Sequence, residues 1–140
     1  MGQHPSKNII KTGANKQQTV QSIKRSLNTG SSNDRAYSDY VNDTQDFAYI
    51  EVHRTIIAFI SWKGDFIEYL WVSKKKRRKG YAKKLFDFYK NKHFTFSFYM
   101  TSKSKSFWER MVEINRETHR VQQVSEPIGE KMIWTRKLIL

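Results

Sequence analysis

Cysteine is absent from this sequence of 140 residues. Disulfides, thiolate zinc sites and cysteine nucleophiles are therefore excluded, and the lack of cysteine fits a reducing compartment. The four histidines are scattered and none pairs at the spacing of metal ligands, so we expect no metal site. No apolar run approaches the roughly 20 residues of a membrane-spanning helix, and the polar start has no secretory apolar segment. We therefore expect a cytoplasmic protein with no membrane partner.

Negative charge is also scarce. The chain has 13 Asp and Glu against 26 Lys and Arg, which gives a formal net charge of +13. This imbalance favours an anionic partner, whether nucleic acid, an anionic membrane surface or a phosphorylated small molecule, and charge alone does not choose among them. Aromatic residues, by contrast, make up 14% of the chain, which excludes disorder of the whole chain. The length is that of one domain with a real core.

Hydrophobic periodicity predicts an alternation of helices and strands. Apolar residues at spacings of three and four predict helices, whereas alternation or a continuous apolar run predicts strands. The expected helices are 17–27, 35–42, 81–90 and 104–114, with a loop over 28–34. The expected strands are 47–52, 55–62, 66–72, 93–100, 119–125 and 130–138. The first three strands should form an antiparallel meander, and the strand–helix–strand succession that follows predicts a parallel pair.

The most informative stretch lies between an expected strand and an expected helix. Six consecutive cations, Lys74 to Lys79, precede Gly80, whose missing side chain lets the backbone approach a ligand closely. The first amides of the next helix have no intrahelical partner and lie at the positive end of the helix dipole, where phosphate binds readily. By composition alone, the run also fits a solvated basic loop.

The order of residues in this stretch resembles the acetyl-CoA-binding motif of the GNAT superfamily of N-acetyltransferases. That motif is Arg or Gln, two residues, Gly, one residue, then Gly or Ala, and here it reads Arg77-Arg78-Lys79-Gly80-Tyr81-Ala82. Val72 stands five positions before the motif, where the family commonly has an aliphatic residue. The resemblance covers residues 8–140. It implies a single GNAT domain of the α/β class, with a mixed, mostly antiparallel central sheet flanked by helices, preceded by a flexible polar tail over 1–7.

The resemblance implies acetyl-CoA as cosubstrate, with its pyrophosphate held by the backbone amides of the motif. The residues it places around the pyrophosphate are Arg77, Arg78, Lys79, Gly80, Tyr81 and Ala82. Backbone contacts to the pantetheine arm are implied for Trp71, Val72 and Ser73. The amide of Val72 is then the donor to the thioester oxygen, where it stabilises the developing negative charge.

Catalysis of this kind needs a base for the amine, and the departing thiolate takes up a proton. Glu68 lies four residues before Val72 and so on the same face of the expected strand, where members of the family often carry a catalytic carboxylate. The alternative for Glu68 is a surface carboxylate paired with a lysine. A weaker second resemblance places Trp108 where the family often has its proton-donating tyrosine. Because an indole N–H is too weak an acid, the thiolate would take its proton from Tyr99, which is the candidate side chain, from solvent or from the departing ammonium.

The resemblance implies direct transfer of acetyl from acetyl-CoA to a primary amine, and the absence of cysteine fits a reaction without a covalent enzyme intermediate or a metal. The acceptor amine is not identified. The net charge of +13 argues against a polycationic acceptor and favours an anionic partner such as RNA or an acidic protein. Two alternatives stay open: a basic nucleic-acid-binding module without catalysis, and a degenerate GNAT domain that only binds CoA.

Overall fold

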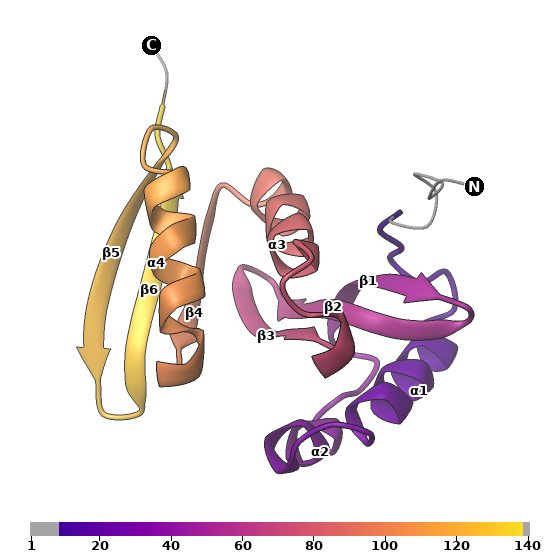
Figure 1. Cartoon of the computed structure of the whole chain (residues 1–140). Helices are drawn as coiled ribbons and strands as arrows, with labels where there is room; N and C mark the ends of the chain where they lie inside the picture. Colours follow the sequence, from indigo (N-terminus) through magenta and orange to yellow (C-terminus); the bar gives the residue numbers. More distant parts are fainter. Residues whose placement is uncertain (1–8, 139–140) are drawn as a thin grey trace. The chain divides into compact units, whose positions relative to one another are not determined.

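A computed structural model describes residues 9–138, which form two compact units (Figure 1). The first unit comprises residues 9–63 and 68–87, and the second comprises 64–67 and 88–138. The tail expected over 1–7 lies outside the described residues, and a single domain over 8–140 remains a prediction. Among the helices that are described, none has the length and apolar character needed to cross a bilayer.

The first unit opens with two helices, α1 (Lys16–Leu27) and α2 (Ser32–Ser38). The start of α2 differs from the sequence prediction, which placed a loop over 28–34 and a helix over 35–42. Ser31 and Asp34 form a capping box in which each side chain accepts a hydrogen bond from the other residue's amide. This box satisfies two amides that a helix start leaves free, so the helix begins and ends earlier than apolar spacing indicated.

The strands of the first unit are β1 (Asp46–Val52), β2 (Thr55–Lys63) and β3 (Phe66–Val72), whose first two residues belong to the second unit. β1 and β2 are antiparallel and joined by a two-residue turn, and β2 and β3 are hydrogen-bonded neighbours. Every residue of β2 except its two ends is buried, as its continuous apolar run predicted. The expected three-stranded meander is therefore confirmed.

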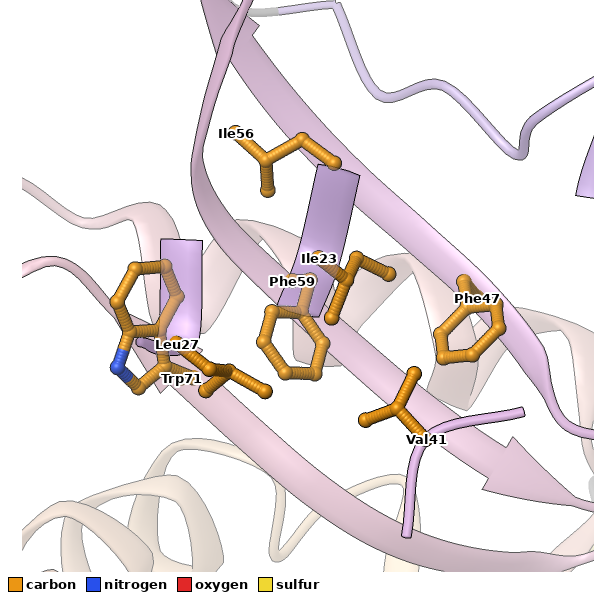
Figure 2. Packing of buried hydrophobic residues seen from close by; sticks show 7 residues of the cluster. All are labelled: Ile23, Leu27, Val41, Phe47, Ile56, Phe59 and Trp71. Atoms are coloured by element: carbon orange, nitrogen blue, oxygen red, sulfur yellow. The ribbon is translucent and has the colours of Figure 1, made fainter. Parts of the chain in front are cut away.

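The face of these strands that packs against α1 carries a cluster of buried apolar side chains. Seven buried side chains from α1, the loop after α2 and the three strands form one cluster: Ile23, Leu27, Val41, Phe47, Ile56, Phe59 and Trp71 (Figure 2). Burial of such a side chain contributes about 1.5–3 kcal/mol to folding. The cluster holds α1 on the strands and keeps the side chain of Trp71 on the α1 face of β3.

A basic loop leads from β3 to the next helix. It contains a short 3₁₀ turn, η2 (Lys74–Lys76), and ends at α3 (Tyr81–Lys92), of which residues 81–87 belong to the first unit. Leu85 and Phe86 are fully buried, which anchors the helix that follows the loop. The predicted helix at this position is confirmed.

The second unit contains β4 (Thr95–Met100), η3 (Ser102–Ser104), α4 (Lys105–Ile114), β5 (His119–Glu126) and β6 (Gly129–Arg136). β6 pairs antiparallel with both β4 and β5. Phe66, at the start of β3, pairs with Ser97 of β4 in parallel, which confirms the predicted parallel pair. The hydrogen-bonded strand order is β1-β2-β3-β4-β6-β5, so the sheet is mixed and mostly antiparallel, as expected.

Candidate functional site

The loop between β3 and α3 has an unusual backbone. Arg78 and Gly80 both have positive φ, 63° and 84°. Glycine adopts this left-handed conformation freely, whereas other residues adopt it rarely. A Cβ atom on Gly80 would meet no other atom within 4 Å, so the space beside this backbone is open. The loop therefore exposes its main chain where the motif requires contact with a ligand.

The N-terminus of α3 lacks a capping side chain because Gly80 stands before it. The carbonyl of Gly80 accepts the first helical hydrogen bond, from the amide of Lys84, at 3.0 Å. The amides of Tyr81, Ala82 and Lys83 have no carbonyl acceptor within the helix and lie at the positive end of its dipole. Together with the open space beside Gly80, these donors suit a phosphate group.

Positive charge around these amides is uncompensated. Among the described residues, Lys74–Lys76, Arg78 and Lys79 have no side-chain hydrogen bond or ion pair. Arg77 differs from them, because its Nε donates to the carbonyl of Val72 at 3.0 Å and closes the loop onto the end of β3. Arg77 therefore shapes the loop, while the other cations remain available to an anion.

At the end of β3, the amides of Val72 and Ser73 point in different directions. The amide of Ser73 donates to the carbonyl of Ile57 in β2 at 2.8 Å. Because successive amides of a strand point to opposite edges, the amide of Val72 points away from β2. The donor role of the Val72 amide requires this orientation and stays a prediction. The amide of Ser73 is already engaged, so a contact from Ser73 to a ligand would use its carbonyl or hydroxyl.

Glu68, the predicted base, lies in a hydrogen-bonded network. Its Oε1 accepts a hydrogen bond of 2.7 Å from Nε2 of Gln45, a side chain only 2% exposed. The same Nε2 donates to the hydroxyl of Tyr37 at 2.9 Å, and that hydroxyl lies 2.7 Å from Oγ of Ser61. Glu68 forms no ion pair with a lysine among the described residues, which argues against the alternative of a lysine-paired surface carboxylate.

Proton positions in this network follow from its chemistry. An amide nitrogen only donates, so the oxygen of Tyr37 accepts from Gln45 and its proton is available to Ser61. Burial is the main cause that raises the pKa of Tyr37, so this phenol stays protonated. The sequence pattern gave no indication that Gln45 and Tyr37 belong to this network, because contacts between residues far apart in the sequence leave no periodic signal.

A second polar cluster lies beside the first. The buried carboxylate of Asp34 accepts hydrogen bonds from the hydroxyl of Tyr69 at 2.9 Å and from Nε1 of Trp71 at 3.1 Å. The ring of Tyr69 also stacks on that of Tyr37, with centroids 4.0 Å apart. Burial, followed by the bond to Asp34, raises the pKa of Tyr69. These contacts orient the side chains of β3 on the face that α1 and α2 cover.

Tyr99 and Trp108 belong to the second unit. The hydroxyl of Tyr99 donates to Oε1 of Glu126 at 2.5 Å, and this hydrogen bond is the main cause that raises the pKa of Tyr99. Trp108 is buried and stacks on Phe98, with centroids 4.0 Å apart. Trp108 is therefore a core side chain. Glu126, which the sequence analysis missed, is the partner that limits how Tyr99 could release its proton.

No known family model matches this sequence, and no curated protein matches it either. Solved structures do match. The N-acetyltransferase YlbP of Bacillus subtilis, solved with coenzyme A, is 15% identical with a TM-score of 0.60, covering 91% of this chain and 95% of that chain. An acetyltransferase of the GNAT family from Bacillus cereus is 16% identical with a TM-score of 0.56, covering 94% and 98%.

A third similar structure is the aminoglycoside 6'-N-acetyltransferase of Enterococcus faecium. It is 10% identical with a TM-score of 0.55, and the match covers 92% of this chain and 96% of that chain. Similarity at such low identity concerns the fold. This chain has the fold of the GNAT acetyltransferases, as the resemblance of its motif and element order predicted.

Proposed function

We propose that this chain is an N-acetyltransferase that transfers acetyl from acetyl-CoA to a primary amine. The observation that carries the proposal is the loop over 77–82, which combines unpaired helix amides, uncompensated cations and open space beside a left-handed Gly80. The GNAT fold supports it. So do the coenzyme A in the Bacillus subtilis structure and the aminoglycoside that the Enterococcus faecium enzyme's name gives as its acceptor.

Acetyl-CoA supplies the acetyl thioester, and residues of the first unit fit its polar groups. The amides at Gly80, Tyr81 and Ala82 would bind the pyrophosphate, with Arg78 and Lys79 adding charge. Arg77 would act indirectly, because its bond to the Val72 carbonyl holds the loop in shape. The pantetheine arm would contact the backbone of residues 71–73, with the Ser73 amide excluded as a donor.

In the chemical step, Glu68 would accept a proton from the ammonium group, directly or through one water. The free amine then attacks the thioester carbon directly, so no acetyl group becomes bound to the enzyme. As the C–N bond forms, the C–S bond breaks, CoA leaves as the thiolate and the attacking nitrogen loses its second proton. The Val72 amide, which points away from β2, would donate to the oxygen on which negative charge develops. Gln45 donates to Oε1 of Glu68 and would hold its carboxylate in position for the proton transfer.

Tyr99 is our candidate for protonating the thiolate, but its hydrogen bond to Glu126 must first break. Its proton already lies in a hydrogen bond to Glu126, so it must leave that partner before it can reach a thiolate. If Tyr99 acts in this way, Tyr99→Phe lowers turnover. Normal turnover in Tyr99→Phe would assign the proton to solvent or to the departing ammonium.

The uncompensated cations also support an anionic partner beyond the cosubstrate, such as RNA or an acidic protein. We propose a cytoplasmic setting for the reaction, on the ground that the chain has no cysteine.

Calorimetric titration with acetyl-CoA, followed by thiol release in a broad amine screen, tests the function. We expect Gly80→Asp to abolish binding, because a carboxylate would repel the pyrophosphate and occupy its space. Gly64→Asp is the matched control, since Gly64 is also left-handed, with φ 56°, and also has open space around its Cα. Equal affinity for acetyl-CoA in the two folded variants would rule out the loop as the pyrophosphate site.

The same experiment separates the alternatives. Binding of acetyl-CoA without thiol release from any amine would indicate a degenerate GNAT domain that only binds CoA. Absence of binding, combined with salt-sensitive retention on RNA or DNA, would indicate a nucleic-acid-binding module.

A further inference from the structure

A cavity of about 290 Å³ lies in the first unit, between the end of α1, the turn from β1 to β2 and the end of β3. Its lining contains two arginines, five hydroxyl-bearing residues and three apolar residues, and no carboxylate. The lining residues are Ser22, Arg25, Ser26, Thr29, Arg54, Thr55, Ile56, Ile57, Trp71 and Ser73. This composition is that of an anion site with an apolar wall.

Both arginines of the cavity are uncompensated. Arg25 and Arg54 are exposed, and neither has a hydrogen bond or ion pair within the described part of the chain. A cation in the last turn of a helix stabilises the helix dipole, which accounts for Arg25 in α1. Arg54 has no such role. Two like charges at one cavity repel each other unless an anion lies with them.

Arg54 stands at a turn position whose backbone conformation does not favour arginine. His53 and Arg54 form the two-residue turn between β1 and β2, and both have positive φ, 51° and 64°. This is the geometry of a type I′ turn, which Asn-Gly fits far better than two bulky residues. Turn formation therefore does not explain the arginine, and strain of this kind is typical of functional positions.

The overall charge of +13 could by itself place arginines at any surface cavity, so we compared this cavity with a neighbouring one. This second cavity, of about 310 Å³, shares Ser22 and Ile56 with the first. Its lining includes Glu51 and contains no lysine or arginine. Cationic groups are thus concentrated at one of two adjacent hollows along α1.

We propose that the cavity between α1 and the β1–β2 turn binds a small organic anion. A phosphate or carboxylate group would accept paired hydrogen bonds from the guanidinium groups of Arg25 and Arg54. The body of the ligand would lie against Ile56, Ile57 and Trp71. The cavity volume of about 290 Å³ lies just below the roughly 300–1,000 Å³ typical of small-molecule sites, which fits a small ligand.

This site does not depend on the proposed acetyl transfer. Its lining comes from α1 and the face of β3 that α1 covers, whereas the candidate pyrophosphate loop leads into α3. Trp71 and Ser73, whose backbone we place against the pantetheine arm, are common to the cavity and the candidate cofactor site.

Calorimetry with phenyl phosphate and benzoate tests the site, with phenol as the uncharged probe. We expect both anions to bind and phenol not to bind. Arg25→Gln and Arg54→Gln should each weaken anion binding about tenfold or more, the loss expected for a charge-assisted hydrogen bond. Arg120→Gln is the control, since this exposed arginine of β5 has no partner among the described residues and its loss removes the same charge. Absence of anion binding, or equal weakening in Arg54→Gln and Arg120→Gln, would overturn the proposal.

A turn variant separates binding from folding. The double substitution His53→Asn and Arg54→Gly should raise the melting temperature, because it relieves the left-handed strain, and should weaken anion binding at least as much as Arg54→Gln does. Unchanged anion binding in this more stable variant would also overturn the proposal.

Competition between acetyl-CoA and phenyl phosphate identifies the source of the anion. If acetyl-CoA displaces phenyl phosphate, the cavity receives a phosphate of CoA, and if both bind together, it receives a separate molecule.

Discussion

Among single residues, Glu68 has the most direct part in the proposed chemistry. Glu68→Gln should lower turnover by about 10²–10⁴, the usual effect of removing a general base, while acetyl-CoA affinity stays nearly unchanged. The loss should ease at high pH, where free amine is abundant. Steady-state rates from pH 6 to 10 check this, with Glu109→Gln, an exposed carboxylate of α4, as control. If Glu68→Gln turns over normally at neutral pH, Glu68 is not the base.

Gln45 should act through Glu68. Gln45→Leu removes the 2.7 Å hydrogen bond that holds the carboxylate in place. We therefore expect a lower kcat with nearly unchanged affinity for acetyl-CoA, measured by steady-state kinetics and calorimetry. A purely structural role would lower the free energy of unfolding and leave kcat of the folded variant unchanged. Gln21→Leu, on the exposed side of α1, provides the control.

At the level of elements, Asp34 joins α2 to β3. Its carboxylate caps α2 and also accepts bonds from Tyr69 and Trp71, and a Cβ on Gly30 would lie only 2.2 Å from its Oδ2. Asp34→Ala should lower the free energy of unfolding by about 3 kcal/mol, because a cap is lost and two donors lose their acceptor. Urea denaturation measures this. Asp39→Ala, at the exposed end of α2, should change stability little.

The whole molecule has a net charge of +13, and three consecutive lysines, Lys74–Lys76, contribute to it at one place in the chain. Replacing these three lysines with Gln should weaken acetyl-CoA binding modestly at low salt. The loss should shrink at high salt, where exposed charges are already screened. A triple control, Lys103→Gln with Lys105→Gln and Arg110→Gln, removes the same charge from the second unit. If acetyl-CoA affinity is unchanged while retention on RNA falls, the run binds nucleic acid.

Local signals in the sequence were sufficient for most of the fold. Continuous apolar residues predicted β2, alternation predicted β4, and the turn residues between strands predicted the meander, because each signal acts within a few positions of the chain. The prediction for α2 failed, since a capping interaction between Ser31 and Asp34 outweighed the apolar spacing that was used to locate the helix. The motif over 77–82 likewise indicated the loop that the structure shows to be left-handed at Arg78 and Gly80.

Tertiary structure alone decided which partners the candidate catalytic groups have. Gln45 reaches Glu68 across 23 positions of sequence, and Tyr99 reaches Glu126 across 27. No periodicity or spacing encodes such pairs, because they form only after strands and loops have packed. The same holds for Arg25 and Arg54, which line one cavity although a helix and a strand separate them in the sequence. Residue types and their order thus determined the fold and the motif, whereas burial and long-range hydrogen bonds determined the state and the partners of each group.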